Sequence, residues 1–387
     1  MKRSHLAALL LAVPAALVPA AGTALASGQD ASPRLVTVEQ APDSKAINGS
    51  YIVTLKPGTT AKGLAKREDI TTRHVYKGVL NGFSAKLSAD QLAELRGDPS
   101  VKAIEEDQKV TAAATQSNAT WGLDRIDQRN RPLSGTYTYN RNGSGVTAYI
   151  IDTGIDTSHP DFGGRARNVY DALGGNGQDC HGHGTHVAGT VGSNTYGVAK
   201  GVALRGVRVL GCDGSGAYSG IIAGFDWVRN NATKPAVANA SIGGGYSSAV
   251  NDAAAALNNS GVFLSVAAGN DNADACNTSP ASAPGVLSVA ASDSSDRKAS
   301  FSNYGSCTDL FAPGVSITST RLGGGTTQMS GTSMASPHAT GVAALYKSNK
   351  GDAASSTIND WLTSNATTNV ISNPSGTPNR LLFKSDL

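Results

Sequence analysis

The larger, C-terminal part of the chain repeats one pattern: an apolar run of strand length, a glycine-rich turn, and a helical pattern of apolar and polar positions. Because these runs are apolar throughout, they are typical of strands that are buried on both faces of a sheet. Strands that alternate with helices predict a mostly parallel sheet covered on both sides, which is an α/β fold in three layers. The runs that we interpret as strands are residues 147–151, 207–210, 237–241, 262–266 and 286–290.

The preceding part of the chain has a different pattern, which predicts a separate small α+β unit over about residues 49–110. Residues 51–55 alternate between apolar and polar and end at a Lys-Pro-Gly turn, as expected of a strand. Ser88 and Gln91 have the spacing of a capping box, which predicts a short helix through Leu95. Further strands are expected at residues 80–87 and 101–105.

The first 26 residues have the three parts of a secretory signal peptide. A basic Met-Lys-Arg start precedes a run rich in alanine, leucine and valine, and an Ala-Leu-Ala sequence ends at Ala26. Pro14, Pro19 and Gly22 interrupt the run, which argues against a transmembrane helix. We therefore expect cleavage after Ala26 and secretion. No later run approaches the roughly 18 apolar residues that span a bilayer, so we expect no membrane association after cleavage.

Composition and charge narrow the class of protein. With 387 residues the chain can bury a sizeable core and hold two or three domains. Only 16% of the residues are charged and 45 are glycine, which suits a compact, turn-rich secreted protein. A net charge of +3 is too small to argue for binding to nucleic acid or acidic membranes. Four cysteines follow the export signal, so we expect disulfides, in any of three pairings.

Three local motifs carry groups that together can cleave an acyl bond. Residues 331–338 read Gly-Thr-Ser-Met-Ala-Ser-Pro-His and place Ser333 before a helical run, where unpaired N–H groups can hold an oxyanion. A serine hydroxyl is a weak nucleophile and needs a base together with an orienting carboxylate. Asp152 ends an apolar run, and His183 lies in a His-Gly-His-Gly-Thr-His motif. These residues supply both groups.

The chain order Asp152, His183, Ser333 resembles that of the subtilase family of serine proteases, in particular its proteinase K and aqualysin type. The resemblance implies that Asp152 orients His183, that His183 acts as general base, and that Ser333 is the nucleophile. It also implies that Asn270 and the backbone N–H of Ser333 form the oxyanion hole. The expected protein is a monomeric, secreted endopeptidase that cleaves unfolded or exposed polypeptides through an acyl-enzyme.

Two glycine-bearing segments are expected to bind an extended substrate by strand addition. In the related enzymes they flank the substrate, and the second segment walls the specificity pocket together with residues 267–269. Thr278 stands where proteinase K-type enzymes have a tyrosine near the pocket base. The family default is an apolar or aromatic preference, and the sequence leaves the depth of the pocket open. The residues concerned are Gly214, Ser215, Gly216, Ser241, Ile242, Gly243, Gly244, Ala267, Ala268 and Gly269.

The small α+β unit, with its Asn-Gly-Phe-Ser-Ala sequence from Asn81, resembles the inhibitory prodomain of subtilases. Residues 27–113 would then be a propeptide that inhibits its own enzyme, and the protein would be a self-processing zymogen. We interpret polar residues 27–48 as a tether and residues 109–118 as a cleavable linker. Alignment on Trp121 implies that the mature enzyme is a single domain over residues 114–387.

The resemblance also implies two disulfides and bound calcium. The disulfides would be Cys180–Cys212 and Cys276–Cys307. A calcium site would use Asp309 with the carbonyls of Pro284 and Val286, since oxygen ligands suit this ion. A weaker candidate, at which two later ligand positions are occupied by Ser134 and Thr136, would use Asp124, Asp127 and Gln128.

Two alternatives compete with an active serine protease. His181, His183 and His186 have zinc-ligand spacing, but Thr185 stands where binuclear zinc hydrolases normally carry an aspartate. A non-catalytic binding module normally lacks a triad member, whereas all three are present here. Inhibition by a serine-directed phosphonyl fluoride, and not by a zinc chelator, separates the active protease from both alternatives.

Overall fold

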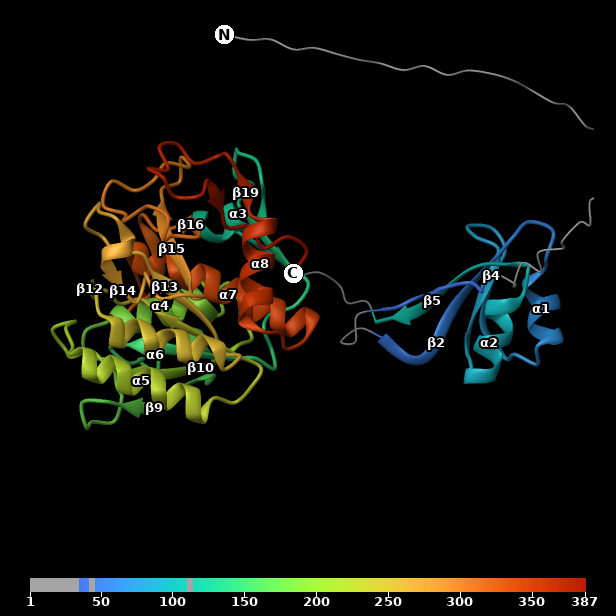
Figure 1. Cartoon of the computed structure of the whole chain (residues 1–387), viewed down its shortest axis with the longest axis horizontal. Helices are drawn as coiled ribbons and strands as arrows, with labels where there is room; N and C mark the ends of the chain where they lie inside the picture. The colour runs from blue at the N-terminus through green and yellow to red at the C-terminus, as the bar shows by residue number, and fades with distance from the viewer. Residues whose placement is uncertain (1–34, 42–45, 110–113) are drawn as a thin grey trace, which may run out of the picture. The chain divides into compact units, whose positions relative to one another are not determined.

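The computed structural model describes residues 35–41, 46–109 and 114–387. The chain forms two compact units, one built mainly from residues 49–106 and the other from residues 107–387 (Figure 1). The expected signal segment and residues 110–113, beside the expected cleavage position, lie outside the described residues.

The N-terminal unit is a five-stranded sheet with two helices and its own apolar core. Ser88 and Gln91 form the predicted capping box, in which each side chain bonds to the other residue's backbone. Phe83 and Leu95 are fully buried in the core. In order across the sheet the strands are β1 (Val38–Glu39), β5 (Val101–Gln108), β2 (Ala46–Leu55), β4 (Gly82–Lys86) and β3 (Thr72–Tyr76). The helices are α1 (Ala61–Arg67) and α2 (Ala89–Gly97).

The interpretation of residues 27–48 as a tether is wrong where the structure describes them. Val38 lies in β1, which pairs with β5, and β2 already begins at Ala46. Val36 and Val38 pack against the core of this unit. Two apolar residues at alternate positions are too short a pattern to be recognised as a strand without the sheet that they join.

The C-terminal unit contains a nine-stranded sheet, which is parallel except at one edge. Each predicted strand is present with its ends displaced. The largest displacement is in β10, which begins earlier than expected because Arg205 and Gly206 interrupt its apolar pattern. In order across the sheet the strands are β19 (Thr367–Thr368), β20 (Arg380–Leu381), β16 (Leu310–Pro313), β15 (Leu287–Ser292), β13 (Phe263–Ala267), β11 (Ala236–Ala240), β8 (Thr147–Asp152), β10 (Ala203–Arg208) and β9 (Ala166–Asp171), with β19 and β20 antiparallel.

Helices cover both faces of this sheet, which gives the predicted three layers (Figure 1). Ala148 and Ile150 of β8 point into the core that includes α4 (His183–Gly192) and α7 (Thr332–Lys350). Tyr149 and Ile151 point to the opposite core, beneath α5 (Tyr218–Asn231) and α6 (Ser248–Asn259). α3 (Trp121–Asp127) and α8 (Ser355–Asn365) contribute to the first core. Alternate residues of one strand therefore hold helices on opposite sides.

Three two-stranded sheets and two short 3-10 helices complete the unit. β6 (Ala114–Ser117) pairs with β7 (Thr136–Tyr139), so the prediction of a linker through residue 118 is wrong from Ala114 onward. The other pairs are β12 (Gly244–Gly245) with β14 (Thr278–Ser279) and β17 (Ile317–Thr320) with β18 (Thr326–Met329). The 3-10 helices are Pro160–Phe162 and Ala275–Asn277. Across the described residues, every helix is too short or too polar to cross a bilayer.

Candidate active site

The candidate catalytic residues gather at the carboxyl edge of the parallel sheet, where open α/β sheets place their sites. Asp152 is the last residue of β8, Ser241 follows β11 directly, and Asn270 lies shortly after β13. His183 and Ser333 come from the first turns of α4 and α7, which pack against each other. Sheet order therefore brings together residues that are far apart in sequence.

Asp152 and His183 form a close pair. Nδ1 of His183 lies 2.8 Å from Oδ1 and 3.0 Å from Oδ2 of Asp152, which has no solvent exposure. The N–H of Thr153 donates to Oδ1 at 2.7 Å. The carboxylate therefore holds the proton on Nδ1 and leaves Nε2 as the basic nitrogen. Burial lowers the pKa of His183, whereas the charge of Asp152 and its hydrogen bond raise it. The raising effects outweigh burial, so the pKa of His183 lies above its ordinary value.

The backbone hydrogen bonding of α7 is interrupted at the carbonyl of Ser333. Pro337 lies four residues further along α7 and has no N–H, so it cannot bond to the carbonyl of Ser333. The hydroxyl of Ser241 donates to that carbonyl instead, at 2.8 Å, while the Ser333 hydroxyl donates to the carbonyl of Ser241 at 3.1 Å. Rotation about the Cα–Cβ bond of Ser333 would be needed to direct its hydroxyl toward a base.

Asn270 is oriented by the residue before the nucleophile. Its Oδ1 accepts the N–H of Thr332 at 2.8 Å and the hydroxyl of Thr332 at 3.0 Å. With its oxygen committed, the amide nitrogen is the group that can donate to a substrate oxygen. The sequence did not reveal the role of Thr332, although this residue lies within the serine motif.

A cavity of about 460 Å³ opens beside Ser333. The predicted residues Ile242, Gly243, Gly244, Ala267 and Gly269 line it, together with Asn270 and Thr332. Thr278 also lines it, in agreement with its expected place near the pocket. Gly245, the last residue of the glycine-bearing segment that begins at Ser241, lines it as well. Sequence analysis missed the remaining lining residues, which are Asp271, Ala273, Asp274 and Asn277.

A buried asparagine braces one wall of this cavity. Asn303 has no solvent exposure, and its Oδ1 accepts the N–H groups of Asp271 and Ala273 at 2.9 and 3.0 Å. Gly269 has φ +107°, and a Cβ there would lie 2.2 Å from Nδ2 of Asn303, so only glycine fits. Nothing near Asn303 in the sequence signals this contact, because its partners belong to a distant strand end.

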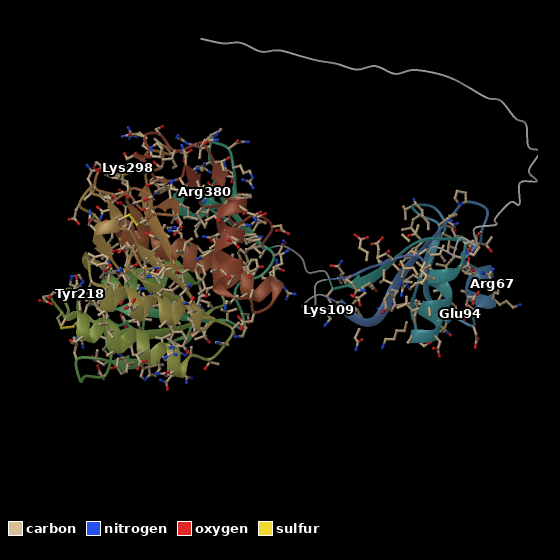
Figure 2. All side chains as sticks on the ribbon, in the orientation of Figure 1. Arg67, Glu94, Lys109, Tyr218, Lys298 and Arg380 are labelled. Atoms are coloured by element: carbon tan, nitrogen blue, oxygen red, sulfur yellow. A yellow bond between two sulfur atoms is a disulfide. The ribbon has the colours of Figure 1, made fainter. Side chains whose placement is uncertain are left out.

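The other predicted substrate segment lies outside the cavity lining. Gly214 to Gly216 precede α5, and a Cβ on Gly214 would lie 2.9 Å from Nε2 of His181. Cys180 and Cys212 form a disulfide that joins this segment to the loop before His183. Cys276 and Cys307 form the second disulfide, so both pairs are those that the resemblance implied (Figure 2).

The three clustered histidines are held in different ways. Nδ1 of His183 faces Asp152, whereas His186 is fully buried with Nε2 2.9 Å from the carbonyl of Ile317. Burial lowers the pKa of His186 to about 4. His181 is exposed, with its ring centroid 6.3 Å from that of His183. Within the described residues, no three histidine, cysteine or acidic side chains come together in a group that could hold a metal ion, which disfavours the zinc alternative.

The two calcium candidates differ in how their carboxylates are used. Oδ2 of the half-buried Asp309 accepts the N–H of Ser288 at 2.8 Å, and burial raises the pKa of Asp309. By contrast, Asp124 accepts hydrogen bonds from Ser134 and Gly135, and Asp127 pairs with Lys384 at 2.9 Å. The two carboxylates of the second candidate therefore already bind donor groups of the protein, which disfavours calcium binding there.

Comparisons with known proteins agree with this geometry. Residues 143–381 match the subtilase family, and residues 50–113 match peptidase inhibitor I9. An extracellular serine proteinase of Thermus sp. (strain Rt41A) is 54% identical, over 80% of this chain and 77% of its own. Proteinase R of Parengyodontium album is 48% identical, over 88% and 89%. A crystal structure of a cold adapted subtilisin-like serine proteinase has 53% identity and a TM-score of 0.68, covering 69% of this chain and 99% of its own.

Proposed function

The chain belongs to the subtilase family of serine proteases, and from this premise we propose that Asp152, His183 and Ser333 are its catalytic triad. The protein is a secreted enzyme that carries an inhibitor-type prodomain. The observation that carries the residue assignment is the Asp152–His183 pair at the same sheet edge as the first turn of α7. This pair supplies both the base and the orienting carboxylate that a serine nucleophile needs.

In the proposed reaction, Nε2 of His183 removes the hydroxyl proton of Ser333 while Oγ of Ser333 attacks the carbonyl carbon of a peptide bond. The resulting oxyanion accepts hydrogen bonds from the amide of Asn270 and the backbone N–H of Ser333. His183 then gives the proton to the leaving amine, and the C–N bond breaks to leave an acyl-enzyme. Water, deprotonated by His183, attacks the ester and releases the acid and Ser333.

The substrate is proposed to be an extended polypeptide that pairs with the backbone edge from Ser241 to Gly245. One substrate side chain would enter the cavity beside Ser333, whose volume is in the range of ordinary ligand pockets. Ile242 and Ala267 supply apolar parts of the cavity wall, and this supports a broad preference for apolar or aromatic residues before the scissile bond. A profile of cleavage sites on a peptide library tests this preference directly.

Replacement of the nucleophile tests the assignment as a whole. Ser333→Ala should lower the rate of peptide hydrolysis by several orders of magnitude, because it removes the attacking oxygen and leaves the fold intact. The precursor should also stay uncut between Ala113 and Ala114. A variant that processes itself and hydrolyses casein would show that another residue is the nucleophile.

We also propose a structural calcium site at Asp309. A cavity of about 500 Å³ is lined by Asp309, Val286 and Asn359, whose buried Oδ1 accepts no hydrogen bond within the described residues. A free amide oxygen and a half-buried carboxylate fit the preference of calcium for oxygen donors. Arg380, labelled in Figure 2, lines the same cavity and should weaken the site by its charge.

The calcium proposal is tested by thermal unfolding with calcium and with a chelator. Calcium should raise the Tm of the wild-type precursor, and Asp309→Asn should abolish that rise. Arg380→Gln should increase it, because a repelling charge is removed. Asp252→Asn, on the exposed surface of α6, is the control and should respond like the wild type. An equal rise in all four proteins would place calcium elsewhere.

A further inference from the structure

The loop in front of α4 holds a buried carboxylate that the proposed reaction does not use. Asp179 is only 7% exposed. Its Oδ1 accepts the N–H groups of His181 and Gly182 at 2.9 and 2.8 Å. Its Oδ2 accepts the N–H of Thr185 at 2.9 Å and the hydroxyl of Thr185 at 2.5 Å. His183 lies between these anchored residues, so one side chain holds the backbone on both sides of the histidine.

A threonine connects this carboxylate to the strand that carries Asp152. The hydroxyl of Thr153 donates to Oδ1 of Asp179 at 2.9 Å and accepts the N–H of Gly184 at 2.9 Å. Thr153 directly follows Asp152, and its own N–H donates to the Asp152 carboxylate. A continuous set of hydrogen bonds therefore joins the end of β8 to the first turn of α4.

We propose that Asp179 is a positioning residue of the proteolytic site, which fixes the helix start bearing His183 against the strand end bearing Asp152. The inference rests on the proposed function, in which these two residues act as a pair. α4 begins at His183, and its N-cap residue, Gly182, has no side chain to satisfy the first N–H groups. Asp179 and Thr153 supply the missing acceptors, and a misplaced helix start would move the imidazole away from its reacting position.

The charge of Asp179 adds a second effect. No lysine or arginine forms an ion pair with it anywhere in the described chain. The titratable groups that face His183 are Asp152, Asp179 and the two neighbouring histidines, His181 and His186. Burial lowers the pKa of His183, Asp152 raises it most, and Asp179 raises it further. A second buried negative charge thus favours the imidazolium that forms while His183 holds the proton.

The experiment separates the effect of Asp179 on the orientation of His183 from the effect of its charge. Full-length precursors are allowed to mature, and kcat and KM for a chromogenic peptide are measured as a function of pH. Asp179→Asn should lower kcat about 10- to 100-fold with KM nearly unchanged, because the geometry of the histidine is disturbed. The acidic limb of the kcat profile of this variant should move to lower pH by about half a pH unit, because loss of the negative charge of Asp179 lowers the pKa of His183. Thr153→Val should lower kcat without moving the limb, and Thr153→Ser should restore kcat.

A matched control lies at the other end of the same helix. Asp161 accepts the N–H of Thr195 at 3.0 Å and its hydroxyl at 2.7 Å, one with each carboxylate oxygen, so it holds the same two groups of a threonine that Asp179 holds in Thr185. Asp161→Asn should keep both the wild-type kcat and the wild-type acidic limb. A change of the same size as in Asp179→Asn would mean that the effect is a general loss of stability.

Several outcomes would overturn the inference. One is an Asp179→Asn enzyme with a lower Tm but with the kcat and acidic limb of the wild type. If Asp179→Asn does not mature, the threonine pair decides, and equal kcat for Thr153→Val and Thr153→Ser would refute positioning. Activity in Ser333→Ala would instead overturn the proposed function, so the two failures are distinguishable.

Discussion

At the scale of single residues, the candidate site depends on which hydrogen-bonding groups of its side chains and backbone are already bonded to neighbouring residues and which are free. The carbonyl of Ser333 receives no hydrogen bond from Pro337, which has no N–H, and accepts one from the hydroxyl of Ser241 instead. Thr332 commits the oxygen of Asn270 and so directs the amide nitrogen toward the cavity. The expected chemistry of each residue follows from these contacts.

Asn270→Ala should lower kcat about 100-fold with little change in KM, since loss of one oxyanion donor typically costs about 3 kcal/mol of transition-state stabilisation. Asn270→Asp keeps an oxygen for Thr332 but replaces the donor with a negative charge, so it should lose at least as much. Steady-state kinetics of both variants on one peptide provide the measurement. An Asp variant that is more active than the Ala variant would contradict a donor role.

The acidic limb of kcat/KM should lie above the ordinary histidine range of about 6.5. His183 must be neutral to accept a proton, and Asp152 raises the pKa of His183 despite burial. Activity should therefore be full above that raised pKa and fall as the pH decreases through it. A pH profile of kcat/KM measures the limb. A limb at or below the ordinary range would show that burial outweighs the carboxylate.

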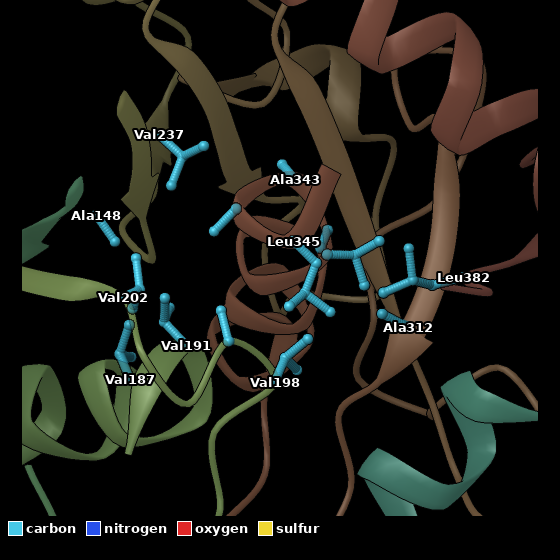
Figure 3. Packing of buried hydrophobic residues seen from close by; sticks show 14 of the residues in the cluster. Ala148, Val187, Val191, Val198, Val202, Val237, Ala312, Ala343, Leu345 and Leu382 are labelled. Carbon is cyan, nitrogen blue, oxygen red and sulfur yellow. The ribbon is translucent and has the colours of Figure 1, made fainter. Parts of the chain in front are cut away.

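At the scale of elements, the site depends on how closely α4 and α7 approach. Figure 3 shows Val187 and Val191 of α4 in one cluster with Ala343 and Leu345 of α7. Gly341 lies in the middle of α7, where a Cβ would be 2.5 Å from Cβ of Val198. Gly341 thus lets the segment that follows α4 lie against α7, a contact that a larger side chain would prevent.

Gly341→Ala should destabilise the C-terminal unit by about 1–3 kcal/mol, because overpacking at Val198 exceeds the gain in helix propensity. Gly220→Ala in α5 is the matched control, since its Cβ would meet Ala172 at an ordinary 3.6 Å. This control should be neutral or more stable by about 0.5–1 kcal/mol. Chemical unfolding in a Ser333→Ala background avoids self-digestion, and equal stability changes in both variants would contradict the packing argument.

At the scale of the whole molecule, the chain contains two units, each with its own core. The N-terminal unit matches a peptidase inhibitor, and the C-terminal sheet is built from parallel strands that pair across long sequence separations. Such long-range pairing is slow to form, because loop closure must precede the contacts that stabilise it. We therefore expect the N-terminal unit to aid the folding of the C-terminal unit.

Residues 27–113 should speed the refolding of residues 114–387 and inhibit the mature enzyme at micromolar concentration. Recovered activity and a titration of mature enzyme with the isolated propeptide are the two measurements. Phe83→Ala, which opens a cavity in the fully buried core of the propeptide, should weaken both effects. If the mature segment refolds equally well alone and is not inhibited, these residues have another role.

The sequence alone was sufficient for the features that depend on local pattern. Apolar runs indicated the buried strands, Ser88 and Gln91 indicated a helix start, and the order of Asp152, His183 and Ser333 led to the family. These signals lie within a few residues of one another, where chain geometry fixes the spacing.

Only the tertiary structure decided which distant groups meet. The cysteine pairing, left open by the residues and supplied only by resemblance, depends on which loops share the sheet edge. The brace made by Asn303, the contact of Ser241 with Ser333, and the link from Asp179 to Thr153 join segments that no short pattern relates. Their partners are set by strand order and helix packing, because a hydrogen bond requires atoms to lie within about 3 Å and only the folded chain brings them there.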